Sequence, residues 1–518
     1  MDAAPGHQLS NRIGSSPVLR FLVGDELWTP NHCAVFLLTF TSYALVHASR
    51  KTLSTVKPSL ISEWTDNTTY VEPLFADKHS AESFLAFLDG AFLGAYALVG
   101  DFLTCLRRNG TLTSLRGLYV GGTLGDRYDP AKVLAAGMWT SSVTIFLFGT
   151  LSKWLALRSL SYYTATWIAC GLFQSVAWPT EIAVMGSWFG HNSRGAVLGL
   201  WSACASVGNI LGTLVSSQTV QMGYEYSFAA NSGSLFVGGI LIFFCLSPSP
   251  HQHERDAADI FDGASGQRKA ISFWRAWFLP GVIAYSLAYA CLKLVNYSFF
   301  FWLPFYLHAH YGWKESLADE LSAWYDLGGI VAAVVAGIAS DRFSSRTPIL
   351  VSMLVMSMGA LFFYANSPNS VLVNSLLMAL TGFFVGGPAN LISSAVSADL
   401  GKAEVIRGSA EALSTVTGII DGTGSVGAGI GQLLIPKIEA RFGWIAVFYG
   451  FIAMMFSTIL CLVPLLWREM NERARYVRLR PEVVEGDVTP SSSDSSSNSE
   501  TGNPHLPVRI RHRNPPED

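Results

Sequence analysis

The chain has 518 residues, of which 50% are hydrophobic and 14% are charged, and its net charge at pH 7 is −3. Soluble domains carry roughly 25% charged residues, so the composition indicates a protein that crosses a membrane several times. The charge provides no basic surface for nucleic acid. The seven cysteines have no CxxC or Cys/His spacing, so we expect no disulfide, metal site or cofactor.

Runs of about 20 apolar residues can cross a bilayer as helices, and the sequence contains twelve such runs. They lie near 31–53, 84–124 (interrupted), 133–152, 162–187, 195–217, 228–247, 278–308, 319–340, 348–366, 370–397, 408–435 and 443–466. We therefore predict an all-α membrane protein with twelve transmembrane helices in two six-helix halves. The expected parts are a cytosolic N-terminal segment at 1–30, halves at 31–247 and 278–467, a cytosolic loop at 248–277, and a disordered cytosolic tail at 468–518.

The distribution of charge predicts the orientation. Lys and Arg are more frequent in the loops on the side of the N-terminus, which favours both termini in the cytosol. The start of the chain lacks the pattern of a cleaved signal peptide. The sequon at Asn67 then lies in the first outer loop, where glycosylation occurs, although a three-residue pattern also arises by chance.

A short motif occurs at equivalent places in the two halves. GTLGDRYDPAK follows the second run, and GIASDRFSSR follows the eighth, six runs later. Duplicated six-helix halves predict this recurrence, and the motif resembles the loop signature of the major facilitator superfamily. The aspartate of each copy can cap a helix end and pair with a cation across the cytosolic gap. The charged residues of these conformational loops are Asp126, Arg127, Asp341 and Arg342.

The second run is interrupted by an anomalous segment from Val99 to Arg116. It carries three arginines, each costing roughly 2.5–3.5 kcal/mol in a lipid-facing helix. Removing it leaves an unbroken apolar run, as expected for an unspliced short intron. A regulatory insert is the alternative. We expect the segment to lie outside the helix or to pack poorly.

Charged residues within the apolar runs define the candidate site, and those we single out are Arg50, Lys293, Asp326 and Asp421. A cation persists in a membrane only where it faces water or an anionic partner. The first and seventh runs correspond between the halves, so Arg50 and Lys293 would converge on the central cavity where such transporters hold substrate. Two cations favour an anion such as phosphate. The alternative is that they only pair with Asp326 and Asp421 as structural bridges.

Neighbouring residues complete these expectations. Asn296 follows Lys293 by one turn on the same helix face, and Tyr297 belongs either to the site or to the interface. Lys51 lies about 100° around the helix from Arg50, so we expect it to extend towards the outer interface. The aromatic residues 299–302 are expected to face lipid. Asp326 and Asp421 are either gating partners of the cations or helix-packing residues.

Longer motifs give a specific resemblance. YALVHASRKTL, FQSVAWPTEIAVMGSWFGHNSRGAVLGLW, LVNYSFFFWLPFYL and SSAVSADLGKAEVIRGSAEALSTVTGIIDGTGSVGAGIG resemble the organophosphate:phosphate antiporter family. Within it, they are most similar to the animal sugar-phosphate exchangers of the glucose-6-phosphate transporter group. The similarity extends from about Asn31 to Trp467.

The resemblance implies particular roles. Arg50 falls on the first-helix arginine that binds substrate phosphate in bacterial relatives, and Trp178 matches the fourth-helix Trp-Pro motif. Asp326 falls where those relatives carry a glutamate.

Two positions depart from the bacterial pattern. The seventh-helix arginine aligns with Asn296, which leaves Lys293 as the nearby cation. The fifth-helix histidine aligns with Ala205, so no residue is expected to take a histidine's role. These departures put tight coupling of the exchange in doubt.

The expected function is secondary transport, not enzymatic catalysis. A sugar phosphate such as glucose 6-phosphate would exchange for inorganic phosphate by alternating access, with the lipid bilayer as the surroundings. The alternatives are a proton-coupled organic-anion symporter, with Asp326 or Asp421 as proton site, and a non-transporting membrane sensor or scaffold. Membership of the animal group implies the endoplasmic reticulum membrane, with an endolysosomal membrane as the second location.

Overall fold

The computed structural model describes residues 29–66, 73–106, 129–189, 194–247, 273–343, 346–401 and 413–479. The chain forms two compact units, Met1–Met470 and Asn471–Asp518. The first unit contains the helices that position the site. All the regular elements of the described residues are helices, as predicted.

The N-terminal half begins with α2, which is capped by Thr29 and has Pro30 at its first position, a combination typical of a helix start. In chain order the helices of this half are α2 (Pro30–Trp64), α3 (Lys78–Leu106), α5 (Pro130–Ile145), η2 (Phe146–Leu151), α6 (Ser152–Trp154), α7 (Leu160–Gln174), α8 (Ala177–Trp188), α9 (Arg194–Ser202), α10 (Cys204–Thr219), η3 (Val220–Met222) and α11 (Tyr224–Cys245).

The C-terminal half has its own set of helices. They are α13 (Phe273–Trp277), α14 (Val282–Tyr311), α15 (Glu315–Arg342), α16 (Thr347–Ala365), α17 (Val371–Leu391), η4 (Ile392–Val396), α18 (Ser397–Leu400) and α19 (Leu413–Leu479). Gly443 interrupts α19 with φ 77° and ψ 173°. Glycine adopts this left-handed φ without a steric penalty, so the last two predicted spans meet at a sharp bend.

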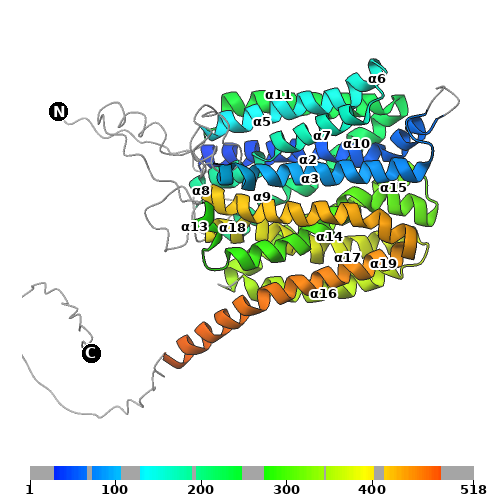
Figure 1. Cartoon of the computed structure of the whole chain (residues 1–518). Helices are drawn as coiled ribbons and strands as arrows, with labels where there is room; N and C mark the ends of the chain where they lie inside the picture. Colours follow the sequence, from blue (N-terminus) through cyan, green and yellow to red (C-terminus); the bar gives the residue numbers. More distant parts are fainter. Residues whose placement is uncertain are drawn as a thin grey trace, which may run out of the picture. The chain divides into compact units, whose positions relative to one another are not determined.

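The membrane-spanning helices agree with the twelve-helix prediction. Ten helices of the described part are long and apolar enough to cross a membrane. One of the ten contains the bend at Gly443 and so provides two spans, and α3 occupies the position of the second predicted span. The helices lie side by side in Figure 1, with α18 near one end of the bundle and α6 near the other. We call these the α18 end and the α6 end.

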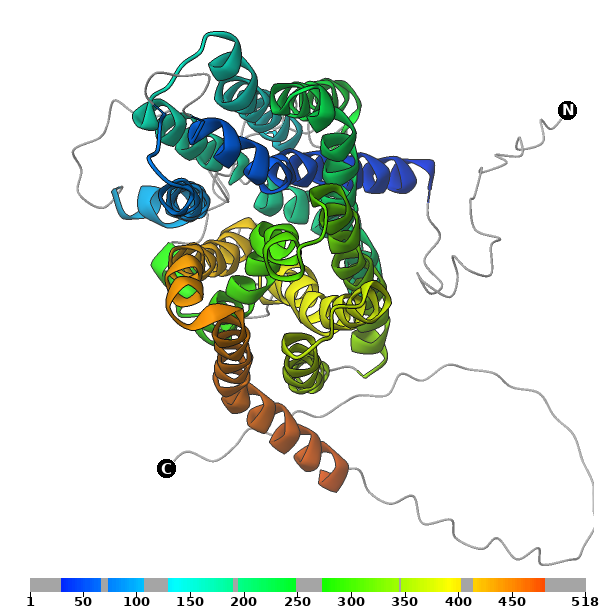
Figure 2. The ribbon, with the colours of Figure 1, turned by 90° about the vertical axis from the view of Figure 1, so that its right-hand side faces the viewer.

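The two halves form two groups of helices, as the view along the bundle shows (Figure 2). Glycines let helices from different halves approach closely. A Cβ on Gly90 of α3 would lie 3.2 Å from the Gly429 carbonyl oxygen of α19, and one on Gly199 of α9 would lie 2.5 Å from the Ala333 oxygen of α15. Such small residues are typical of close helix contacts in membranes.

Glycines also fix the helix that carries Arg50. A Cβ on Gly208 of α10 would lie 2.2 Å from the Ala44 oxygen of α2, and one on Gly212 would lie 2.5 Å from the Ala48 oxygen. Side chains at these positions would push α2 away from α10. The backbone just before Arg50 is therefore held by direct contact with α10.

Several predicted features lie partly or wholly outside the described residues. Residues 99–106 are helical and continue α3, so this part of the anomalous segment is not looped out of the helix. The alternative expectation, poor packing, concerns side chains outside the described part. The remainder of the segment, 107–116, lies outside the described residues, as do Asn67, Asp126 and Arg127.

Candidate substrate site

Arg50 lies on α2 and is 2% exposed. Its Nε donates to Gln174 Oε1 of α7 at 2.5 Å, and its Nη1 donates to the Tyr297 hydroxyl of α14 at 3.4 Å. Its guanidinium carbon lies 4.8 Å from the centre of the Tyr96 ring of α3. Gln174 also donates to Ser49 at 3.2 Å, which fixes the amide that holds the guanidinium. Both halves therefore contribute to the position of Arg50.

Lys293 lies on α14 and is also buried, with 2% exposure. Its Nζ donates to Asp421 Oδ1 of α19 at 2.6 Å and to Ser425 Oγ at 2.8 Å. A Cβ on Gly424 would lie 2.9 Å from Lys293 Cδ, so this glycine leaves room for the lysine stem. The prediction left two aspartates as possible partners for the cations, and Asp421 is the one that lies against Lys293.

Two tyrosines connect the cations. Lys293 Nζ lies 5.3 Å from the ring centre of Tyr96 and 5.0 Å from that of Tyr297. These are the same two residues that contact Arg50. Aromatic faces attract cations at such distances. The structure therefore brings Arg50 and Lys293 to one place between the halves.

The charges of this cluster do not balance. Lys293 pairs with Asp421, whereas Arg50 forms no ion pair with any described residue. Its Nη2 is buried without a hydrogen-bond partner in the described part of the chain. Buried polar groups normally have partners, and a buried charge is costly without one. The unpaired N–H group fits an anionic ligand, because a guanidinium binds oxyanions through several N–H groups.

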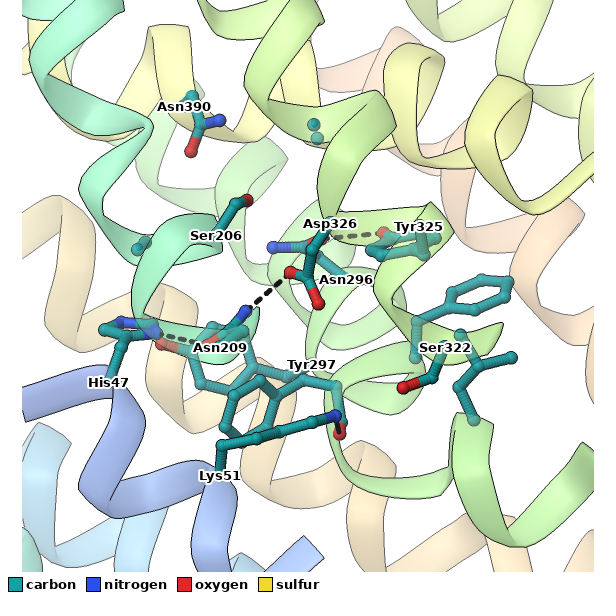
Figure 3. A pocket seen from close by; sticks show the side chains of 16 residues that line it. His47, Lys51, Ser206, Asn209, Asn296, Tyr297, Ser322, Tyr325, Asp326 and Asn390 are labelled. Atoms are coloured by element: carbon teal, nitrogen blue, oxygen red, sulfur yellow. Dashed lines mark hydrogen bonds between the residues drawn. The ribbon is translucent and has the colours of Figure 1, made fainter. Parts of the chain in front are cut away.

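A polar pocket lies beside this cluster (Figure 3). Tyr297 belongs to both, since it lines the pocket and contacts the two cations. Side chains from α2, α10, α14, α15 and α17 face the pocket. Its labelled lining residues are His47, Lys51, Ser206, Asn209, Asn296, Tyr297, Ser322, Tyr325, Asp326 and Asn390.

A hydrogen-bonded chain crosses the pocket from one half to the other. Asn209 Nδ2 of α10 donates to Asp326 Oδ1 of α15 at 2.7 Å, and His47 Nδ1 lies 3.0 Å from Asn209 Oδ1. Since Asn209 uses its oxygen as the acceptor, His47 carries its proton on Nδ1. His47 is thus a histidine in the same pocket as Ala205, where the resemblance to the bacterial family predicted none.

The structure bears on three sequence-based predictions. Asp326 was expected to be either a gating partner of Arg50 or Lys293 or a helix-packing residue. It forms an ion pair with neither cation among the described contacts, and it accepts from Asn209 and interacts with Lys51. Lys51 was expected at the outer interface, but it is buried and its Nζ donates to the Phe300 oxygen at 2.8 Å. Residues 299–302 were expected to face lipid, but all four are buried. Residues 46–57 of α2 are all buried, so rotation from Arg50 does not lead to lipid.

Asn296 lies where α14 faces α15 and the pocket. Its Oδ1 accepts from the Tyr325 hydroxyl at 2.7 Å. Unlike Lys293, with which it was expected to share a face, Asn296 lines the pocket (Figure 3).

Towards the α6 end of the bundle, α2 contacts the backbone of α14. Pro304 has no N–H group, so the Phe300 oxygen lacks its usual helical partner. Lys51 donates to this oxygen at 2.8 Å and Ser54 at 3.0 Å. Lys57 donates to the Phe301 oxygen at 3.3 Å. Three residues on one face of α2 thus bind two adjacent carbonyls of α14.

Lys57 also forms a buried ion pair that the sequence-based prediction missed. Its Nζ lies 2.5 Å from Asp89 Oδ2 of α3, and the two side chains are 1% and 0% exposed. The Trp302 ring centre lies 4.3 Å from the same nitrogen. No described residue other than Lys57 forms an ion pair with Asp89.

Trp178 connects the halves on the other side of the site. Its Nε1 donates to the Ser393 oxygen of η4 at 3.1 Å, and its ring stacks on Trp201. The resemblance singled out Trp178 as part of the fourth-helix Trp-Pro motif, but it did not predict these contacts.

The second loop motif begins in the last turns of α15, and its final residue, Arg346, contacts α18. Arg346 Nε donates to Asp399 Oδ2 of α18 at 2.7 Å, and its Nη1 donates to Ser340 at 2.8 Å. Arg342 is exposed at the last position of α15. The side chain of Asp341 lies outside the described part.

Comparison with known proteins identifies the class. The family model of the Major Facilitator Superfamily matches residues 39–407 and 321–485. The chain belongs to this superfamily of membrane transporters, and so it is a multi-pass integral membrane protein, not an enzyme.

Individual relatives are more specific. The chain is 48% identical to sugar phosphate exchanger 3 of Bos taurus over 480 residues, covering 85% of this chain and 93% of that protein. It is 46% identical to sugar phosphate exchanger 3 of Xenopus laevis over 496 residues, covering 87% and 95%. A D-xylose–proton symporter has the same fold, with a TM-score of 0.56 at 14% identity over 84% of this chain and 97% of the symporter.

Proposed function

We propose that this protein exchanges a sugar phosphate, such as glucose 6-phosphate, for inorganic phosphate. The observation that carries the proposal is the buried Arg50, whose Nη2 has no hydrogen-bond partner among the described residues and which contacts the same two tyrosines as Lys293. The names of the similar proteins support the sugar-phosphate part. Arg50 binds the phosphoryl group, and Lys293 completes the anion site.

Asp421 holds Lys293 when no anion is bound, because an ammonium left alone in this environment would be costly. An incoming phosphate competes with Asp421 for the same nitrogen. Substrate binding would thereby loosen the contact between α14 and α19, which couples occupancy to helix movement.

Alternating access is supported by contacts on both sides of the site. Lys51 and Ser54 join α2 to α14 towards the α6 end. Trp178 joins α8 to η4 towards the α18 end. Opening on one side would break the set on that side and could leave the other set intact. We place the α18 end in the cytosol with both termini, and Asn67 is glycosylated on the other side. We propose the endoplasmic reticulum membrane as the location. The loop motifs with Asp126, Arg127, Asp341 and Arg342 act in the transition between the two open states.

Purified protein in phosphate-loaded liposomes tests the exchange. Phosphate inside the liposomes should accelerate uptake of glucose 6-phosphate, and a pH gradient alone should not drive it. Uptake that is independent of internal phosphate would contradict the proposal.

Proton-coupled transport is the second candidate. It is favoured by the chain from His47 through Asn209 to Asp326, which places protonatable groups at the pocket. In that case an inward proton gradient should accelerate uptake without internal phosphate, and Asp326→Asn should abolish this acceleration.

A further inference from the structure

The pocket beside the cation cluster differs from that cluster in chemistry. Lys51 and Asp326 line it with one charge of each sign, and their side chains interact electrostatically. The Arg50 cluster, by contrast, has two cations and one paired carboxylate among the described residues. An anionic group is therefore favoured at Arg50, and an uncharged polar group is favoured in the pocket.

The pocket has hydrogen-bonding groups that are not yet used. Asn296 accepts from Tyr325 through Oδ1, so its amide N–H groups remain as donors. The side-chain amide of Asn390 forms no hydrogen bond with the described residues, and Figure 3 shows it directed into the pocket from α17. An amide offers both a donor and an acceptor, which is what a hydroxyl group requires.

One wall of the pocket is apolar. Phe299 and Phe300 are buried and line it next to the amides. A sugar presents hydroxyl groups at its edge and C–H groups on its faces, so amides beside aromatic rings match both parts of its surface.

Tyr297 makes the pocket reachable from the phosphate site. Its hydroxyl accepts from Arg50, and its side chain also lines the pocket. A molecule whose phosphoryl group is bound by Arg50 would extend past this ring. We propose that the pocket holds the uncharged, hydroxylated part of the organophosphate, and that Asn296 and Asn390 select the substrate through its hydroxyl groups. This inference rests on the proposed exchange of a sugar phosphate.

The test compares two exchange reactions of the full-length protein in liposomes. Phosphate-for-phosphate exchange uses only the cation cluster, whereas exchange of glucose 6-phosphate for phosphate uses both regions. Asn390→Ala and Asn296→Ala should each raise the half-saturating concentration of glucose 6-phosphate about tenfold, the loss of one buried hydrogen bond. Phosphate-for-phosphate exchange should change less than about twofold, since its ligand does not enter the pocket.

Asn366→Ala is the matched control, because Asn366 is exposed at the end of α16 and donates to the Phe362 oxygen. It should leave both reactions unchanged. A second measurement needs no variant: the unaltered protein should bind deoxy analogues of glucose 6-phosphate more weakly than glucose 6-phosphate, and at least one hydroxyl should matter about tenfold.

The outcomes separate the two proposals. If the variants lose both reactions equally, or if neither the variants nor the deoxy analogues change the sugar-phosphate reaction, the pocket inference is overturned while the exchange stands. If the unaltered protein shows no exchange with phosphate, the proposed function fails and the inference fails with it.

Discussion

Two buried lysine–aspartate pairs have almost the same geometry but different surroundings. The nitrogen–oxygen distance is 2.5 Å for Lys57–Asp89 and 2.6 Å for Lys293–Asp421. Lys57 otherwise contacts a backbone carbonyl and the Trp302 ring. Lys293 shares Tyr96 and Tyr297 with Arg50, which forms no ion pair with the described residues.

The difference is our basis for separating a structural pair from the proposed binding site. A lysine with its own carboxylate is balanced and needs no ligand. Two cations with one carboxylate leave a positive charge that forms no ion pair with the described residues. Burial and ion-pair distance are nearly equal in the two regions, so the proposal of a binding site at Arg50 and Lys293 depends on the local charge count. Four substitutions can test this comparison.

The largest effect is expected from Lys57→Met. It leaves Asp89 buried without its cation, which should lower the free energy of unfolding by about 3–5 kcal/mol. The double variant Lys57→Met/Asp89→Asn should recover most of the stability and keep phosphate exchange. Thermal unfolding in detergent and liposome assays measure the two properties. A stable double variant without transport would show that this pair also acts in function.

Arg50→Lys should reduce phosphate exchange about a hundredfold. Lysine keeps the charge but loses the N–H fork that binds Gln174, Tyr297 and the anion, and charge-assisted hydrogen bonds contribute about 1.5–3 kcal/mol each. Arg441→Lys, at an exposed position of α19, is the matched control. Near-normal phosphate affinity in Arg50→Lys would remove Arg50 from the site.

Lys293→Ala should weaken binding of phosphate and of glucose 6-phosphate together, by about tenfold, since both present the same anion to the cation cluster. The substitution is best made with Asp421→Asn, so that no buried carboxylate is left unpaired. Lys437→Ala, at an exposed lysine, serves as control. If recognition of the sugar part alone changed, the two-cation model would be wrong.

Ser54→Ala should have the smallest effect. It removes one hydrogen bond to the Phe300 oxygen and leaves that of Lys51, a loss of about 1 kcal/mol. A weaker contact between α2 and α14 should open the α6 end more often. Opening can be measured with a single cysteine placed at Ser322 in the pocket, which should react a few times faster with an impermeant reagent added from that end. Ser357→Ala, whose hydroxyl bonds within its own helix, is the control. Equal rates in both variants would indicate that Ser54 does not contribute to closure.

The fold could be predicted from the sequence because its two signals are strong. Apolar runs of membrane length and a motif repeated six runs apart leave few arrangements. Arg50 and Lys293 were found because a charge within such a run costs free energy and therefore indicates a partner, water or a ligand nearby. Their convergence in the structure is the geometric counterpart of the correspondence between the first and seventh runs.

Other site residues gave no such signal. Tyr96 is one aromatic residue in an apolar helix, and nothing in the sequence shows that two cations lie on its faces. Lys57 was missed because α2 continues to Trp64, well past the predicted end of the first span. Asp89 lies within the second predicted run but was not singled out. Helix geometry predicted the direction of Lys51 relative to Arg50. It could not predict that α2 is buried on both of these faces.

The contact between α2 and α14 has an evolutionary consequence. Its acceptors are main-chain oxygens, which every amino acid at positions 300 and 301 would present. Substitutions of these phenylalanines can alter packing, but they cannot delete the acceptors. What makes the Phe300 oxygen available is Pro304, four residues further on. We therefore expect sequence change in this region to be constrained at Pro304 and at the donors on α2, and to be tolerated more readily at positions 300 and 301.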